Sequence, residues 1–164
     1  MMTSGFRWVV LLAGLAASFV AVAGEQGAPA GDIVKIPLAE GVAIQDAVDS
    51  LKLRANALNI KMVGEKPLYK EVEALSGKPY RYVHIFEFCD ALTASKMLDY
   101  NPDIVVYMPC RIALYQDLEG KAWIGSINMD RLVDMVQDPE LKKEAQKVRD
   151  GMMEIMQAGA NGEL

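Results

Sequence analysis

The residues with the greatest chemical potential in this sequence are its only two cysteines, Cys89 and Cys110, which are 21 positions apart. The surrounding pattern predicts that Cys89 ends one strand, that Cys110 lies in the next strand, and that a helix joins them. Neighbouring strands lie about 4.8 Å apart, so the two sulfur atoms can meet if the strand register allows it. We therefore treat this pair as the candidate site.

Three of the chemistries open to the pair need no metal. A structural disulfide would close a loop of about 20 residues and stabilise the fold by roughly 3 kcal/mol. Two buried free thiols would act as small apolar side chains. A redox or sulfur-handling pair is favoured because Cys89 lies at a predicted helix N-terminus, where the helix dipole lowers a thiol pKa. Arg111 adds positive charge beside Cys110, whereas Asp90 raises the pKa of Cys89.

The fourth chemistry is a soft metal ion such as Cu(I), held by Cys89 and Cys110 together with Met108 or His84. Met108 is two residues from Cys110 and shares its strand face unless Pro109 introduces a bulge. His84 lies on an aromatic strand face, where a packed core histidine is the common case. Because the chain has one His, a site of several histidines is excluded. We expect no cofactor other than this alternative Cu(I).

Other catalytic patterns are missing from the sequence. It contains no Cys-x-x-Cys, Gly-x-Ser-x-Gly or phosphate-loop motif and no zinc-protease spacing. A formal net charge of −5 and a pI near 4.9 argue against nucleic acid as a partner. No acid–base pair can be assigned, so whether the protein is an enzyme stays open.

The elements that must position the cysteines alternate between strand and helix patterns. Apolar residues recur at helical spacing in Ile44, Val48 and Leu51, and strands are marked by β-branched and aromatic runs. We expect residues 104–108 and 112–116 to form one strand that Pro109 interrupts. The strands are expected at 32–37, 60–63, 80–88, 104–116 and 121–127, and the helices at 44–58, 69–75, 90–100, 128–137 and from 138 onward. This order predicts an α+β fold, a mostly antiparallel sheet with helices packed on one face.

The N-terminus has the pattern of a secretion signal. Arg7 precedes an apolar run from Trp8 to Ala23 that is short for a membrane span of about 20 residues, and it ends in a small-x-small cleavage site. We expect cleavage after Ala23, which would leave no membrane anchor and a periplasmic or secreted protein in an oxidising compartment. An uncleaved anchor is the alternative. The expected organisation is a signal at 1–23, a flexible spacer at 24–31, one α+β domain at 32–158 and a disordered tail at 159–164.

Six short sequence features follow one another along the chain from Cys89 onward. They are Cys89, Leu98, Asn101-Pro102-Asp103-Ile104, Met108-Pro109-Cys110-Arg111, Tyr115 and Asp138-Pro139-Glu140-Leu141. With these residues the chain resembles the bacterial and archaeal domain-of-unknown-function family 302 over roughly residues 42–158. The family often has Cys-Asn-Pro where this chain has Cys89-Asp90-Ala91. The resemblance implies a small α+β domain that tends to dimerise, and no established activity.

Together these features predict a small exported domain centred on Cys89 and Cys110. We expect thiol redox, sulfur handling or ligand binding, in a homodimer with a periplasmic redox or sulfur-oxidation partner. The alternatives are a structural or interaction module with a stabilising disulfide and a Cu(I)-binding protein.

Overall fold

The computed structural model describes residues 31–163 and contains a five-stranded antiparallel sheet in the order β1-β5-β4-β3-β2. The predicted α+β class is confirmed. The strands are β1 (Ile33–Pro37), β2 (Lys61–Lys66), β3 (Val83–Cys89), β4 (Cys110–Gln116) and β5 (Ala122–Ile127). The helices are α1 (Ile44–Ala57), α2 (Leu68–Ser76), α3 (Ala91–Tyr100), the 3-10 helix η1 (Pro102–Tyr107), α4 (Asp130–Asp134) and α5 (Pro139–Asn161).

One face of the sheet forms the core. Successive side chains of a strand point to opposite faces, and in β3 and β4 the fully buried residues are two positions apart. The buried set comprises Phe86, Phe88, Ile112, Leu114 and Ile124. In the β3–β4 register, Phe88 lies opposite Cys110 and Phe86 lies opposite Ile112, which places both pairs on this face.

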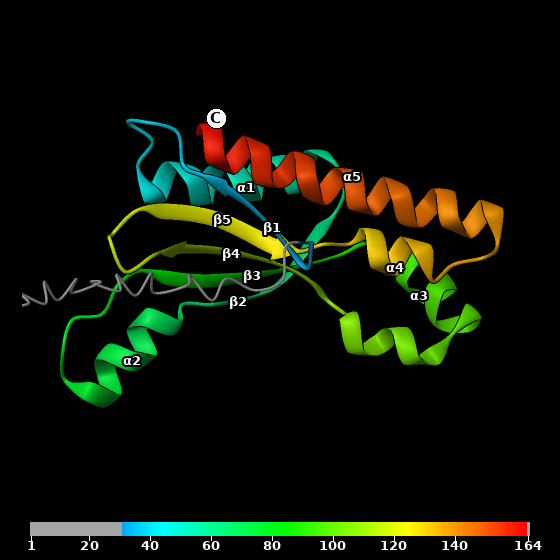
Figure 1. Ribbon diagram of the computed structural model, residues 1–164, viewed down its shortest axis with the longest axis horizontal. Helices are drawn as coiled ribbons and strands as arrows, with labels where there is room; N and C mark the ends of the chain where they lie inside the picture. Colours follow the sequence, from blue (N-terminus) through cyan, green and yellow to red (C-terminus); the bar gives the residue numbers. More distant parts are fainter. Residues whose placement is uncertain (1–30, 164) are drawn as a thin grey trace, which may run out of the picture.

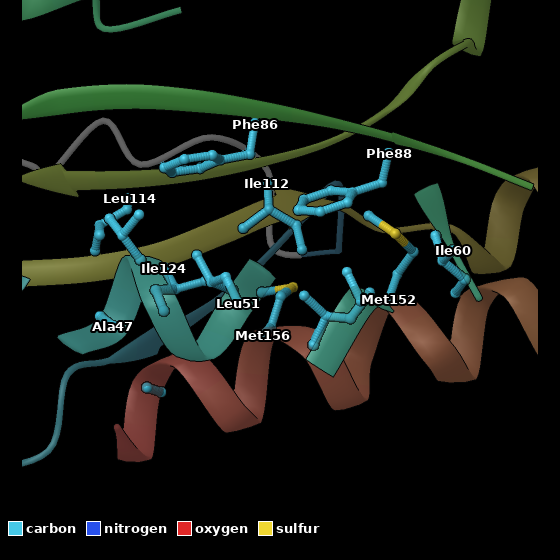
Figure 2. Packing of buried hydrophobic residues seen from close by; sticks show 14 of the residues in the cluster. Ala47, Leu51, Ile60, Phe86, Phe88, Ile112, Leu114, Ile124, Met152 and Met156 are labelled. Carbon is cyan, nitrogen blue, oxygen red and sulfur yellow. The ribbon is translucent and has the colours of Figure 1, made fainter. Parts of the chain in front are cut away.

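The helices α1 and α5 cover this core face side by side, and α2 lies apart from them next to β2 (Figure 1). Figure 2 shows Leu51 of α1 and Met152 and Met156 of α5 packed beneath the phenylalanines of β3. Every residue of α2 stays at least partly exposed. Among residues 31–163, no helix is both long and apolar enough to cross a membrane.

Several boundaries differ from the sequence-based expectation. The strand expected at 80–88 begins only at Val83, the one expected at 60–63 extends to Lys66, and the helix expected at 128–137 covers only Asp130–Asp134. Residues 104–108 were expected as a strand, yet Pro102–Tyr107 is a 3-10 helix. The Asn101 side chain accepts a hydrogen bond from the Asp103 backbone N–H (3.0 Å), and Pro102 stands in the first turn, which together start a helix. Burial of Ile104 then anchors this short helix, so β4 begins only at Cys110.

The C-terminal boundary lies later than expected. Residues 159–161, expected in the disordered tail, belong to α5, because Gly159 and Ala160 are buried in it. The helix ends at Gly162, which adopts φ 65° and donates its N–H to the Gly159 carbonyl. The predicted signal at 1–23 with cleavage at Ala23, and residues 24–30 of the spacer, lie outside the described residues.

A glycine permits the close approach of α5 to α1 and the sheet. A Cβ atom at Gly159 would lie 2.6 Å from Leu51 Cγ and 2.9 Å from Ile124 Cδ1. Both neighbours are fully buried and have little room to move. The absence of a side chain at position 159 therefore sets the helix–sheet spacing.

Replacing Gly159 by valine is expected to lower the free energy of unfolding by about 1–3 kcal/mol, because the added methyl groups overpack the core. Denaturant unfolding measures the change. Gln157→Val provides the matched control, because it puts the same residue at an exposed position of the same helix. Because valine is a better helix former than glycine, a loss of stability at position 159 comes from packing, and an unchanged or raised stability of Gly159→Val would contradict the overpacking.

Candidate functional site: a sulfur-lined pocket

A small pocket lies where β3 ends and β4 begins. Figure 1 shows that α3, α4 and α5 border this end of the sheet. Its volume is about 40 Å³. Cys89 and Asp90 lead from β3 into α3, whereas Met108 and Pro109 lead from η1 into β4. The lining residues are Phe88, Cys89, Asp90, Thr93, Ala94, Met97, Tyr107, Met108, Pro109, Cys110, Met129, Leu132, Val133, Ala145 and Val148.

Five sulfur-containing side chains contribute to this lining: Cys89, Cys110, Met97, Met108 and Met129. The other lining side chains are apolar apart from Asp90, Thr93 and Tyr107. A space of this size holds an ion or a water molecule and is far smaller than the 300–1,000 Å³ typical of organic ligand sites. The pocket therefore suits a small, soft species.

The structure brings Cys89 and Cys110 to the same pocket as free thiols. The structural disulfide, one of the alternatives left open by the sequence, is therefore not formed here. In the register, Cys110 is paired with Phe88 and Cys89 is paired with Lys61 of β2. Cys89 is the last residue of β3, one position beyond the pair formed by Phe88 and Cys110, so both thiols line the same pocket without being joined in a disulfide.

Both thiols titrate above their ordinary range. Burial raises the pKa of Cys110 to about 11, and the nearby Cys89 adds to this effect. Burial also raises the pKa of Cys89, and the negative charge of Asp90 contributes in the same direction. Both side chains are therefore protonated at neutral pH. Of the two opposing effects that the sequence indicated for Cys89, the raising of its pKa by Asp90 is the one that the structure bears out, with burial as the larger cause.

The N-terminus of α3 explains why the helix does not activate Cys89. The Asp90 carboxylate caps the helix, accepting hydrogen bonds from the backbone N–H groups of Leu92 (3.2 Å) and Thr93 (3.3 Å). The Thr93 hydroxyl donates a further bond to it (3.0 Å). The free N–H groups of the first turn thus bind a carboxylate already in place, not a thiolate.

Arg111 is outside the pocket. It follows Cys110 on β4, so it points to the other face of the sheet, opposite Glu87 in the register, and is exposed. Pro109 and Met108 both line the pocket, and Pro109 directly precedes β4. The peptide bond between Met108 and Pro109 is cis. Met108 therefore stays near Cys110 as expected, although it lies outside the strand.

His84 is also outside the pocket. It lies on β3 four residues, or roughly 13 Å, from Phe88. Its Nδ1 is 3.0 Å from the Tyr82 hydroxyl, its ring stacks on Phe86 with centroids 4.2 Å apart, and its Nε2 is 3.6 Å from Glu65 Oε2. Burial lowers the pKa of His84 despite the opposing effect of Glu65. This geometry is that of a packed core histidine.

Sequence reasoning missed Met97 and Met129 as pocket residues. Met97 belongs to the buried face of α3, and Met129 directly precedes α4. Helical periodicity assigns Met97 to an inward face but does not say that this face borders the cysteines. Within residues 31–163, no three side chains of His, Cys, Asp and Glu are gathered as a metal site. The pocket lining instead brings methionine side chains together with the two cysteines.

Comparison with known proteins adds the family and supports the fold. The family model described as Domain of unknown function DUF302 matches residues 34–159. The crystal structure of an uncharacterised conserved DUF302 protein from Bacillus stearothermophilus is similar, with a TM-score of 0.64 at 17% sequence identity. The match covers 77% of this chain and 96% of that one. At this identity the likeness shows the fold alone. No curated protein matches the chain.

Proposed function

Because this chain belongs to the DUF302 family, whose name assigns no activity, we infer its function from its own site. We propose that the protein binds Cu(I) as a cargo in the sulfur-lined pocket, through Cys110, Cys89 and the thioether of Met108. The observation that carries this proposal is the gathering of five sulfur-containing side chains around a cavity of about 40 Å³. Export through the predicted N-terminal signal is part of the same proposal.

The chemistry of the walls matches this ion. Thiolate and thioether sulfur are the soft ligands that Cu(I) prefers over harder cations. The Cys110 thiolate neutralises the single positive charge of Cu(I), so its complex with Cys110 and the Met108 thioether is neutral and carries a small desolvation cost in an apolar pocket. Binding of Cys89 as a second thiolate adds one net negative charge. The same apolar walls keep water away from the ion, which favours the reduced state over the more strongly hydrated Cu(II).

The redox and sulfur-handling version has less support. A nucleophilic thiol needs a lowered pKa, whereas the pKa values of Cys89 and Cys110 are both raised. Metal binding places no such demand, because the incoming cation displaces the proton from each thiol that it binds. The raised pKa values therefore weigh against attack on a disulfide and are compatible with metal binding.

Anaerobic titration with Cu(I) against a chromophoric chelator tests the proposal. We expect the wild type to take up one equivalent. Cys110→Ser should weaken binding by more than the 10–100-fold that is typical of losing an outer-shell partner, because it removes a direct ligand. Met108→Leu should weaken it to a smaller extent at nearly unchanged side-chain volume.

Met62→Leu is the matched control, because Met62 is an exposed methionine on β2 outside the pocket lining. Its affinity should equal that of the wild type. Absence of Cu(I) uptake by the wild type, or full affinity in the Cys110→Ser variant, would overturn the proposal.

A further inference from the structure

A second, wider hollow adjoins the sulfur-lined pocket. It has a volume of about 510 Å³ and lies between the end of α1, the start of α3 and the middle of α5. Its lining is Leu58, Asn59, Ile60, Asp90, Leu92, Thr93, Glu144, Lys147, Val148 and Gly151. Asp90, Thr93 and Val148 line both spaces and therefore stand between them. The narrow sulfur-lined pocket is thus bordered by a space of organic-ligand size.

The walls of this hollow carry charges of both signs over an apolar floor. Lys147 is exposed and has no ion-pair partner among residues 31–163. Glu144 is held by Lys96 through contacts of 2.8 and 2.9 Å, and Asp90 stands at the border with the sulfur pocket. Ile60 and Gly151 form part of the floor. A ligand that fits here has an acidic group for Lys147 and a basic group for the two carboxylates.

We propose that this hollow binds a small zwitterionic thiol, such as a short cysteine-containing peptide, that exchanges Cu(I) with the sulfur-lined pocket. The exchange rests on the proposed function, whereas binding of the thiol compound in the hollow does not. The carboxylate of the ligand pairs with Lys147 and its ammonium group lies near Asp90 and Glu144. Its sulfur is then next to Cys89, which adjoins Asp90 and lines the inner pocket.

The transfer is a ligand exchange without electron transfer. The bond between Cu(I) and the carrier sulfur breaks while a bond between Cu(I) and the Cys89 sulfur forms. The proton of the Cys89 thiol moves to the departing carrier thiolate, and copper remains Cu(I) throughout.

The first arm of the test needs no copper. S-methylglutathione, which carries one ammonium group, two carboxylates and a blocked sulfur, is titrated into the whole chain and followed by amide NMR shifts. We expect saturable shifts at Asn59, Leu92 and Lys147. Lys147→Ala should weaken binding about fivefold, the size expected for one exposed ion pair. Lys143→Ala is the control on the same helix, since Lys143 pairs with Glu140 and does not line the hollow.

The second arm measures the rate at which the Cu(I)–glutathione complex loads the protein. Lys147→Ala should slow loading about fivefold and leave the equilibrium Cu(I) affinity unchanged, whereas Lys143→Ala should change neither. A merely structural role of Lys147 would instead lower the affinity or the melting temperature.

The outcomes separate the two proposals. Without shifts around the hollow, or with equal binding by wild type and Lys147→Ala, the inference fails whatever copper does. If S-methylglutathione binds as expected but the protein takes up no Cu(I), the hollow keeps its ligand class and the copper proposal fails, together with the exchange.

Discussion

Replacing Phe88 by alanine is expected to lower the free energy of unfolding by about 3–5 kcal/mol, the range measured for loss of a buried aromatic ring. Phe88 is fully buried in the main core, lies opposite Cys110 in the sheet and lines the sulfur pocket. Its removal leaves a void between the helices and β3 that the surrounding side chains fill only in part. The substitution therefore affects stability and the site together.

Urea unfolding followed by circular dichroism measures the first effect, and the Cu(I) titration measures the second. Tyr80→Ala serves as the control, because Tyr80 is 37% exposed and lies three residues before β3. We expect it to change stability by less than about 1 kcal/mol. If Phe88→Ala lowered the free energy of unfolding by no more than Tyr80→Ala does, the core would have repacked around the missing ring.

The affinity for Cu(I) is expected to rise steeply with pH. The pKa of Cys110 is raised to about 11 and that of Cys89 is raised as well, so both are protonated between pH 6 and 8. Each thiol that becomes a ligand must release one proton. Below the thiol pKa, the affinity therefore increases about tenfold per pH unit for each thiol bound, and about 100-fold for two.

Competition with a chelator of known pH dependence gives this slope. A slope of two for the wild type and one for Cys89→Ser would show that both thiolates bind the ion. A slope of one in both proteins would assign coordination to Cys110 with methionine sulfur. An affinity independent of pH would rule out thiolate ligation and with it the proposed site.

Most of the fold can be predicted from local sequence patterns that extend over a few residues. Alternation along β3 predicts that Phe86 and Phe88 share a face, and helical spacing predicts the buried side of α1. The run Ile104-Val105-Val106 shows the limit of such patterns. Its β-branched residues favour a strand, but the preceding Asn101-Pro102 starts a short helix, and residue 106 remains 71% exposed.

Of the site, the sequence predicted the two cysteines but not all of the methionines around them. Strand order places the two cysteines near each other, and Pro109 marks the start of β4. Which methionines join them depends on how α3 and the segment before α4 pack on the sheet end, a long-range property that spacing does not encode. The sequence also left the pKa of Cys89 undecided between the helix dipole and Asp90, and the structure decides it because the Asp90 carboxylate caps the helix where a thiolate would have to lie.

The register of β3 against β4 determines which face of the sheet each side chain of β4 occupies. In the observed pairing Cys110 lies with Phe88 on the core side and Arg111 lies with Glu87 on the other. A slip of one residue would reverse both, turning the thiol outward and driving a guanidinium into the apolar core. Burying that unpaired charge costs free energy, so the shifted register is disfavoured and the Cys110 thiol stays on the core side. Arg111 does not line the pocket, but its charge on the opposite face of the sheet favours the register that keeps Cys110 in the pocket.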